Sequence, residues 1–142
     1  MPDVIRVLFL CTHNSARSQM AEAFLNRLGA GRFQAFSAGT EARGLHPLAI
    51  QAMAEVGIDI SLQVSKTLER FAGERFDLLV TVCDEANEAC PYFPNALERR
   101  HWSFPDPSAA LGDDAARFAA FVAVRDAIRD RIERELVAVR AR

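Results

Sequence analysis

The sequence VIRVLFLCTHNSAR, residues 4–17, joins an apolar run to a short polar segment. Val4–Leu10 is nearly continuous in Val, Ile, Leu and Phe, as is expected of a strand that is buried on both faces. Beyond the polar segment, apolar residues recur at helical spacing (Met20, Ala21, Phe24, Leu25 and Leu28), and Gly29 supplies a C-terminal stop. These residues predict a buried strand, a loop and an amphipathic helix, in that order.

Strands and helices continue to alternate along the rest of the chain. The further predicted elements are a strand at 33–37, a helix opened by Pro47 and closed by Gly57, a strand at 76–82, a weaker strand near 97–104 and a final helix over 113–139. Such alternation predicts an α/β fold, a four-stranded parallel sheet with helices on both faces and right-handed crossovers. Because no repeat, low-complexity tract or linker interrupts the 142 residues, we expect a single domain over 1–142.

Two cysteines follow directly after predicted strands. Cys11 comes after the first strand and Cys83 after the third. In parallel sheets of this kind, ligands bind beyond the carboxyl ends of the strands. Adjacent strands lie about 4.8 Å apart, and the Cα atoms of a disulfide are separated by about 4.4–6.8 Å. If the first and third strands are neighbours, a modest loop movement brings the two cysteines together.

The loop Cys11–Arg17 has the form C-x5-R, and its residues suit a tetrahedral oxyanion. The small and polar residues between its ends allow successive backbone N–H groups to point into one concavity; they are Thr12, His13, Asn14, Ser15 and Ala16. The N-terminus of the following helix adds positive potential, and the planar fork of Arg17 can hold two oxygens. The same potential favours the thiolate of Cys11, which is the form that attacks.

Three side chains near the nucleophile have different expected roles. Asn14 and Ser18 are candidates for hydrogen bonds that hold the shape of the loop. His13 is expected to be an exposed loop residue rather than a catalytic base. The loop therefore predicts an anion-binding site with Cys11 as its nucleophile.

The composition disfavours several classes of partner. The net charge is −2, with 19 acidic against 17 basic residues, which gives no general attraction to nucleic acid. The arginines of the final helix alternate with acidic residues, as in a solvated, ion-paired face. No apolar run approaches the roughly 20 residues of a membrane span, and the first residues lack the basic leader and cleavage site of a secretory signal. We therefore expect a cytoplasmic protein without a membrane partner.

The sequence contains three cysteines, too few for a disulfide scaffold. In a reducing compartment such cysteines are buried spectators, metal ligands or redox-active groups. Their spacing does not form two knuckle-type pairs, and no nearby His completes a usual zinc set, so no metal site is predicted.

Five segments spread over the chain carry a resemblance to a known family. They are CTHNSARSQMAE (11–22), Ser37-Ala38-Gly39, Gly57-Ile58-Asp59-Ile60-Ser61, VTVCDEANEACP (80–91) and HWSFPDP (101–107). Together they resemble the low-molecular-weight tyrosine phosphatase family, and especially the arsenate reductases built on that fold. The resemblance covers nearly the whole chain and implies that it reduces arsenate to arsenite.

The resemblance also implies roles for Asp106, Cys83 and Cys90. Asp106, between two prolines, would donate a proton to the departing oxygen after Cys11 attacks arsenic. Cys83 would then attack the Cys11 sulfur and release arsenite, and Cys90 would attack Cys83. A thioredoxin-like protein, or a glutaredoxin-like protein with glutathione, would reduce the final disulfide. No bound cofactor is implied, phosphate or sulfate would mimic the substrate, and we expect a monomer.

The chain departs from the family at three places. On an ungapped count, Lys66 stands where some of these reductases use an acidic side chain to hold a monovalent cation, so no cation site is predicted. Ala16 stands where many relatives carry a further cysteine, which leaves the relay intact. Ser108-Ala109 occupy the place of an aromatic pair that helps tyrosine phosphatases to receive phenolic substrates, which weakens the phosphatase interpretation.

Two alternatives to the reductase stay open at this point. A low-molecular-weight phosphatase that hydrolyses phosphomonoesters would need only Cys11, Arg17 and Asp106. A non-catalytic oxyanion-binding or interaction protein would keep the loop without turnover. Turnover that depends on Cys83 and Cys90 separates the reductase from both.

Overall fold

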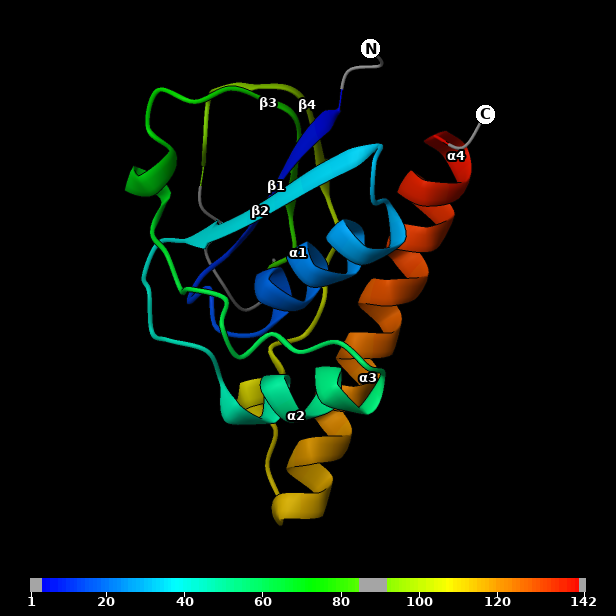
Figure 1. The fold of residues 1–142 in the computed structure, drawn as a ribbon. Coiled ribbons are helices and arrows are strands. Elements are labelled where there is room, and N and C mark those ends of the chain that lie inside the picture. Colours follow the sequence, from blue (N-terminus) through cyan, green and yellow to red (C-terminus); the bar gives the residue numbers. More distant parts are fainter. Residues whose placement is uncertain (1–3, 85–91, 141–142) are drawn as a thin grey trace.

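The computed structural model describes residues 4–84 and 92–140, which contain a four-stranded parallel sheet (Figure 1). The strands are β1 Ile5–Cys11, β2 Phe33–Gly39, β3 Phe76–Thr81 and β4 Ala96–His101, in the spatial order β2-β1-β3-β4. β1 pairs with β2 on one side and with β3 on the other, so the first and third strands are neighbours. The predicted fold class is confirmed.

The helices follow the predicted periodicity. They are α1 Arg17–Leu28, α2 Pro47–Glu55, α3 Asp114–Ile132 and α4 Ala138–Arg140, with a π-helical turn, η3 Glu133–Val137, between the last two and 3-10 turns at η1 Leu68–Phe71 and η2 Pro107–Ala109. Gly29 ends α1, and its N–H donates to the Leu25 carbonyl at 2.8 Å. Among these helices, none is both long enough and apolar enough to cross a membrane.

Two of the predicted strands differ from the observed ones by two residues or more at one end. β2 continues past Ser37 to Gly39, because Gly39 still pairs with Cys11 at the end of β1. β4 begins at Ala96 and ends at His101, so Trp102–Phe104 lie beyond it. A helix end or strand end read from local sequence is accurate only to a few residues.

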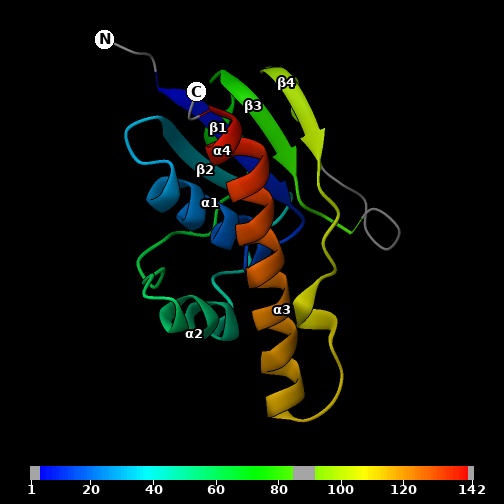
Figure 2. The ribbon, with the colours of Figure 1, turned by 90° about the vertical axis from the view of Figure 1, so that its right-hand side faces the viewer.

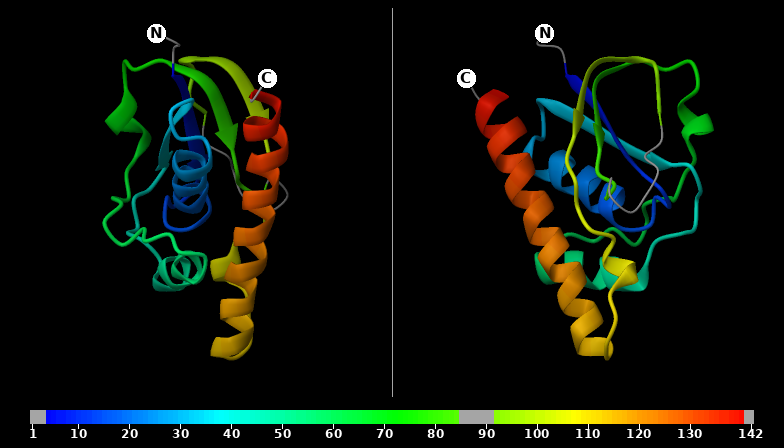
Figure 3. Two further views of the ribbon diagram at one scale, coloured as in Figure 1. Left: turned by 45° about the vertical axis from the view of Figure 1, so that its right-hand side comes forward. Right: turned by 180° about the vertical axis from the view of Figure 1, so that it is seen from behind.

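The two faces of the sheet are covered differently. Alternate side chains of β1 point to opposite faces. Val7 and Phe9 pack in the larger core with residues of α1, α2 and α3, whereas Leu8 and Leu10 pack in a smaller core with Phe71 of η1. Figure 2 shows α1 and α3 together on one face, and Figures 1 and 3 show η1, in green, on the far side of the sheet from α3. The helices α1, α2 and α3 thus pack on one face of the sheet, and the 3-10 helix η1 covers the other.

Candidate active site

The loop between β1 and α1 presents its backbone N–H groups to one concavity. The carbonyls of Thr12 and His13 point outward, where they accept from the N–H groups of Glu41 at 3.0 Å and Arg43 at 3.2 Å. The Ser15 carbonyl likewise accepts from the N–H of His46 at 3.0 Å. In a trans peptide the N–H lies opposite the C=O. The N–H groups that follow these carbonyls are therefore directed inward, as an oxyanion requires.

The start of α1 supports the same conclusion. Its N-cap is Ala16, which makes no side-chain cap hydrogen bond. The first N–H groups of a helix lack partners within the helix and bind anions readily. A residue at this position that cannot cap the helix leaves those donors to a ligand.

Cys11 lies at the centre of the concavity and is 2% exposed. Its Sγ is 2.8 Å from the Ser18 hydroxyl, and the Asn14 amide is also 2.8 Å from that hydroxyl. Asn14 donates through Nδ2 to the Ser18 oxygen, and the Ser18 proton remains available to donate to Cys11 Sγ. The Ser18 hydroxyl is thus placed against the sulfur of the predicted nucleophile.

Arg17 is 3% exposed, and its guanidinium lies between the loop and the segment that carries Asp106. Nη1 donates to the Phe104 carbonyl at 3.2 Å, and Nη2 lies 4.0 Å from Oδ2 of Asp106. These contacts orient the Arg17 guanidinium in the absence of an anion, which reduces the side-chain entropy lost when an oxyanion binds.

Asp106 presents one carboxylate oxygen toward this site. Its Oδ1 accepts from the backbone N–H of Ser108 at 2.9 Å and from the Ser108 hydroxyl at 2.7 Å. The side chain is 23% exposed, and it caps the turn η2. The oxygen that is not engaged with Ser108 is the one that faces Arg17.

Cys83 lies two residues beyond the end of β3, the strand that pairs with β1. It is fully buried, and its thiol lies 3.8 Å from the Leu10 carbonyl of β1. The N–H of Val82 donates to that same carbonyl at 2.8 Å, which fixes the chain just before Cys83. Both cysteines are buried. Cys90 lies outside the described residues.

Two residues near the loop differ from expectation or were not predicted. His13 is half-buried in the wall of a cavity with Ser15, Arg43 and His46, so the prediction of an exposed side chain is wrong. Gly39 was not assigned a role, yet a Cβ there would lie 2.7 Å from the Thr12 carbonyl and 2.9 Å from the Asn14 nitrogen. The only signal was the run of small residues Ser37-Ala38-Gly39 at the end of a strand.

His46 connects the loop to α2. Its Nδ1 accepts from the N–H of Leu48 as the helix N-cap, and its ring packs against Phe121 with centroids 4.5 Å apart. Burial lowers the pKa of His46, nearby Arg117 lowers it further, and Asp106 partly opposes them. The neutral ring is the form that can accept at Nδ1.

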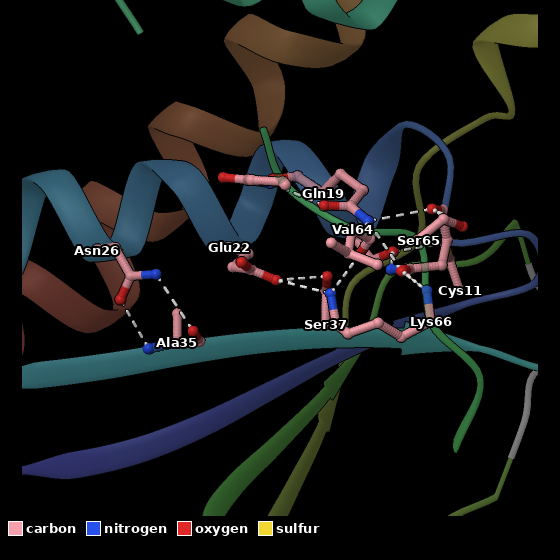
Figure 4. Close-up of polar contacts among 12 residues, drawn as sticks. Cys11, Gln19, Glu22, Asn26, Ala35, Ser37, Val64, Ser65 and Lys66 are labelled. Atoms are coloured by element: carbon pink, nitrogen blue, oxygen red, sulfur yellow. Dashed lines mark hydrogen bonds and ion pairs between the residues drawn. The ribbon is translucent and has the colours of Figure 1, made fainter. Parts of the chain in front are cut away.

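Lys66 and Glu22 form a mostly buried ion pair behind the loop (Figure 4), with Nζ 3.6 Å from Oε1. Burial lowers the pKa of Lys66, although Glu22 raises it. Sequence reasoning assigned no function to either residue. Within residues 4–84 and 92–140, no group of three or more His, Cys, Asp and Glu side chains is placed to hold a metal ion.

The chain is similar in sequence and in fold to known arsenate reductases. The family profile "Low molecular weight phosphotyrosine protein phosphatase" matches residues 6–142. The arsenate reductase of Halalkalibacterium halodurans is 46% identical over 127 residues, which are 89% of this chain and 91% of that protein. A solved arsenate reductase in the phosphate binding state superposes with a TM-score of 0.76 and 35% identity, over 95% of this chain and 98% of the other.

A more distant relative is named for its electron donor. The thioredoxin-dependent arsenate reductase of Corynebacterium glutamicum superposes with a TM-score of 0.62 and 26% identity, over 92% of this chain and 61% of the other. The profile and the 46% identity to a curated protein are sufficient to assign a family. This chain belongs to the low-molecular-weight phosphotyrosine protein phosphatase family, among its arsenate reductases.

Proposed function

We propose that this protein reduces arsenate to arsenite with electrons from its own thiols. The observation that carries the proposal is the placement of two buried cysteines at the same edge of the sheet, Cys11 as the last residue of β1 and at the start of the oxyanion loop, and Cys83 two residues beyond the neighbouring strand β3. A phosphatase requires only the first thiol. The curated arsenate reductase at 46% identity supports the same reaction.

In the first step, the Cys11 thiolate attacks arsenic and one As–O bond breaks. The inward N–H groups of the loop and the fork of Arg17 hold the remaining oxygens. Asp106 gives its proton to the departing oxygen, which leaves as water rather than as hydroxide. The product is an arsenic(V) adduct on the Cys11 sulfur.

In the second step, Cys83 attacks the Cys11 sulfur and forms a Cys11–Cys83 disulfide. The electron pair of the S–As bond passes to arsenic, which leaves as arsenite. The two thiols are thereby oxidised by two electrons and arsenic is reduced by two. Cys90 then attacks Cys83, forms the Cys83–Cys90 disulfide and returns Cys11 to the thiolate.

An external dithiol completes the cycle by reducing the Cys83–Cys90 disulfide. We infer a thioredoxin-like donor, supported by the thioredoxin-dependent relative, with a glutaredoxin-like donor and glutathione as the alternative. The reaction as written requires no metal or bound cofactor. We further propose that the protein acts in the cytoplasm as a single-domain monomer.

A second candidate function is hydrolysis of phosphomonoesters. It is favoured by the arrangement of Cys11, Arg17 and Asp106, which serves phosphoryl transfer as well as attack on arsenic. A non-catalytic oxyanion-binding role is the third.

Arsenite production by the purified protein separates these functions. The assay is run with thioredoxin and its reductase, and in parallel with glutaredoxin and glutathione, beside Cys83→Ser and Cys90→Ser variants. We expect turnover with one donor system and its loss in both variants. Hydrolysis of p-nitrophenyl phosphate without any arsenite would establish a phosphatase instead, and no turnover of either substrate would leave the binding role.

A further inference from the structure

A second segment, residues 64–67, lies against the back of the oxyanion loop; we call it the strap. The backbone N–H of Lys66 donates to Oδ1 of Asn14 at 2.7 Å, and the Ser65 hydroxyl donates to the Asn14 carbonyl at 2.9 Å. The Lys66 carbonyl in turn accepts from the N–H of Gly39 at 3.0 Å. The strap therefore joins the loop to the end of β2.

The hydrogen bond from the strap sets the orientation of the Asn14 amide, and through it the contact between Ser18 and Cys11. A backbone N–H can only donate, so the oxygen of the Asn14 amide must face Lys66. The NH₂ group of Asn14 then faces Ser18, and the Ser18 proton is left for Cys11. Asn14 lies in the left-handed region with φ 49°, a conformation that few non-glycine residues hold without support.

The side chain of Lys66 fastens the strap to the rest of the fold. Its Nζ donates to the Val64 carbonyl at 2.6 Å and lies 3.6 Å from Glu22 on α1. Glu22 also accepts from the Ser37 hydroxyl of β2 at 2.6 Å. Figure 4 shows the Lys66 and Ser37 side chains converging on the Glu22 carboxylate. Strap, helix and strand thus meet at one ion pair.

The ion pair is well shielded from water. The Lys66 and Glu22 side chains are 11% and 15% exposed. Lys66 is also the only lysine in the sequence, where all other side chains of this charge are arginine. A compact ammonium fits between a carbonyl and a carboxylate where a planar guanidinium needs more room.

We propose that Lys66 and Glu22 are positioning residues that hold the strap against Asn14 and so keep the Ser18 proton directed at Cys11. This inference deepens the proposed function, and it rests on that function only in taking Cys11 as the nucleophile. Neither residue touches the substrate in the proposed reaction.

The experiment measures Cys11 directly, without arsenate turnover. In a Cys83→Ser/Cys90→Ser background, iodoacetamide reports on Cys11 alone, and inorganic phosphate protects it. The rate of alkylation is followed from pH 5 to 9, and the phosphate concentration for half-protection is measured at pH 7. The variants are Lys66→Met, Glu22→Gln and Lys66→Arg.

We expect Lys66→Met and Glu22→Gln each to slow alkylation at pH 7 and to weaken phosphate protection by about three- to tenfold, the effect of one lost hydrogen bond. Lys66→Arg should lie between them and the parent. A shift in the same direction in Lys66→Met and Glu22→Gln distinguishes loss of the ion pair from a long-range effect of charge. A charge acting only through space would make the two variants shift alkylation in opposite directions, because one removes a positive and the other a negative charge.

Arg125→Met is the matched control. Arg125 is 7% exposed, and its described hydrogen bonds and ion pairs go to Ala52, Glu55 and Asp126, away from the loop and the strap. We expect it to lower the melting temperature without changing alkylation. Alkylation and phosphate protection within twofold of the parent in both Lys66→Met and Glu22→Gln, or shifts of opposite sign, would overturn the proposal. An arsenate assay that fails while these shifts appear would count against the proposed function alone.

Discussion

Cys11 ends β1 and Cys83 lies two residues beyond the neighbouring β3, and both are buried, yet the described polar groups beside them have opposite character. The sulfur of Cys11 lies 2.8 Å from a hydroxyl whose proton is directed toward it. The thiol of Cys83 lies 3.8 Å from a carbonyl, which can only accept. A donor favours the thiolate and an acceptor favours the protonated thiol. One edge of the sheet thus holds two cysteines in different polar surroundings, which suits the two roles proposed for them.

Serine substitution at each cysteine gives the largest expected effects and tests this division directly. Cys11→Ser should abolish both arsenate reduction and p-nitrophenyl phosphate hydrolysis, by about 10⁴-fold or more, because the nucleophile of both is lost. Cys83→Ser should abolish arsenite production yet leave hydrolysis within a few-fold of the parent. Initial rates for both substrates provide the measurement. Equal losses of hydrolysis in both variants would erase the distinction between the two thiols.

Asp106→Asn tests whether the acid serves the first step only. We expect arsenate reduction and phosphomonoester hydrolysis to fall by about 10²- to 10⁴-fold, because the leaving oxygen is no longer protonated. Alkylation of Cys11 should stay unchanged, since asparagine can still accept from Ser108 and keep the turn. A loss of alkylation equal to the loss of turnover would show that Asp106 shapes the loop instead.

Gly39→Ala should disturb the oxyanion loop that begins at Cys11. Its added Cβ would meet backbone atoms of Cys11, Thr12 and Asn14 at less than 3.0 Å, and backbone cannot move as a side-chain end can. We expect a loss of stability of about 1–3 kcal/mol and weaker phosphate binding. Urea unfolding and phosphate titration measure the two effects. Unchanged phosphate binding would mean that the loop tolerates displacement.

Ser18→Ala removes the donor that distinguishes the two thiols. The rate of Cys11 alkylation at pH 7 should fall by about tenfold or less, which is the effect of losing one hydrogen bond. The Cys83 thiol, followed in a Cys11→Ser/Cys90→Ser background, should alkylate at its former rate. An unchanged Cys11 rate would indicate that the loop and the helix N-terminus suffice to favour the thiolate.

His46→Asn gives the smallest effect and concerns pH. The lowered pKa of His46 means that the unfolded chain binds more protons between that value and the ordinary 6.5. The stability from this group is therefore present above pH 6.5 and is lost as pH falls through the window below it. Asparagine can cap α2 without titrating. Thermal melts at pH 5–7 should show a flatter pH dependence in the variant, and identical curves would refute the assignment.

Local sequence predicted the part of the site that is local in sequence. The unit from β1 through α1 follows from an apolar run, a polar heptapeptide and helical periodicity within 25 residues, and the structure contains it. The placement of Cys11 and Cys83 at one edge of the sheet followed from the general rule for parallel sheets, whereas the pairing of β1 with β3 was only a condition of that prediction and comes from the structure. Both predictions depend on patterns that can be seen in neighbouring residues of the sequence.

The parts that were not predicted depend on distant contacts. Asn14 and Lys66 are separated by 52 positions, and no periodicity signals that a backbone N–H will meet a side-chain oxygen across that distance. The half-buried environment of His13 depends equally on residues 43–46. The cover of the second face also escaped prediction, because a four-residue 3-10 turn has too few residues to show a period.

The outward carbonyls of the oxyanion loop, which leave its N–H groups facing inward, bear on how the protein distinguishes arsenate from phosphate. Backbone N–H groups and a guanidinium recognise four oxygens around a centre, and arsenate and phosphate both present them. In the proposed reaction, a phosphate bound in the loop is held but not consumed, because a thiol attacking the Cys11 sulfur does not reduce phosphorus. In that reaction, arsenate and phosphate are distinguished only after binding, when Cys83 attacks the Cys11 sulfur. Arsenic can accept the electron pair of the S–As bond and leave as arsenite, whereas phosphorus cannot be reduced in this way. Phosphate acts as a competitor that occupies the loop, and the buried thiol of Cys83 is the part of the molecule that makes the choice.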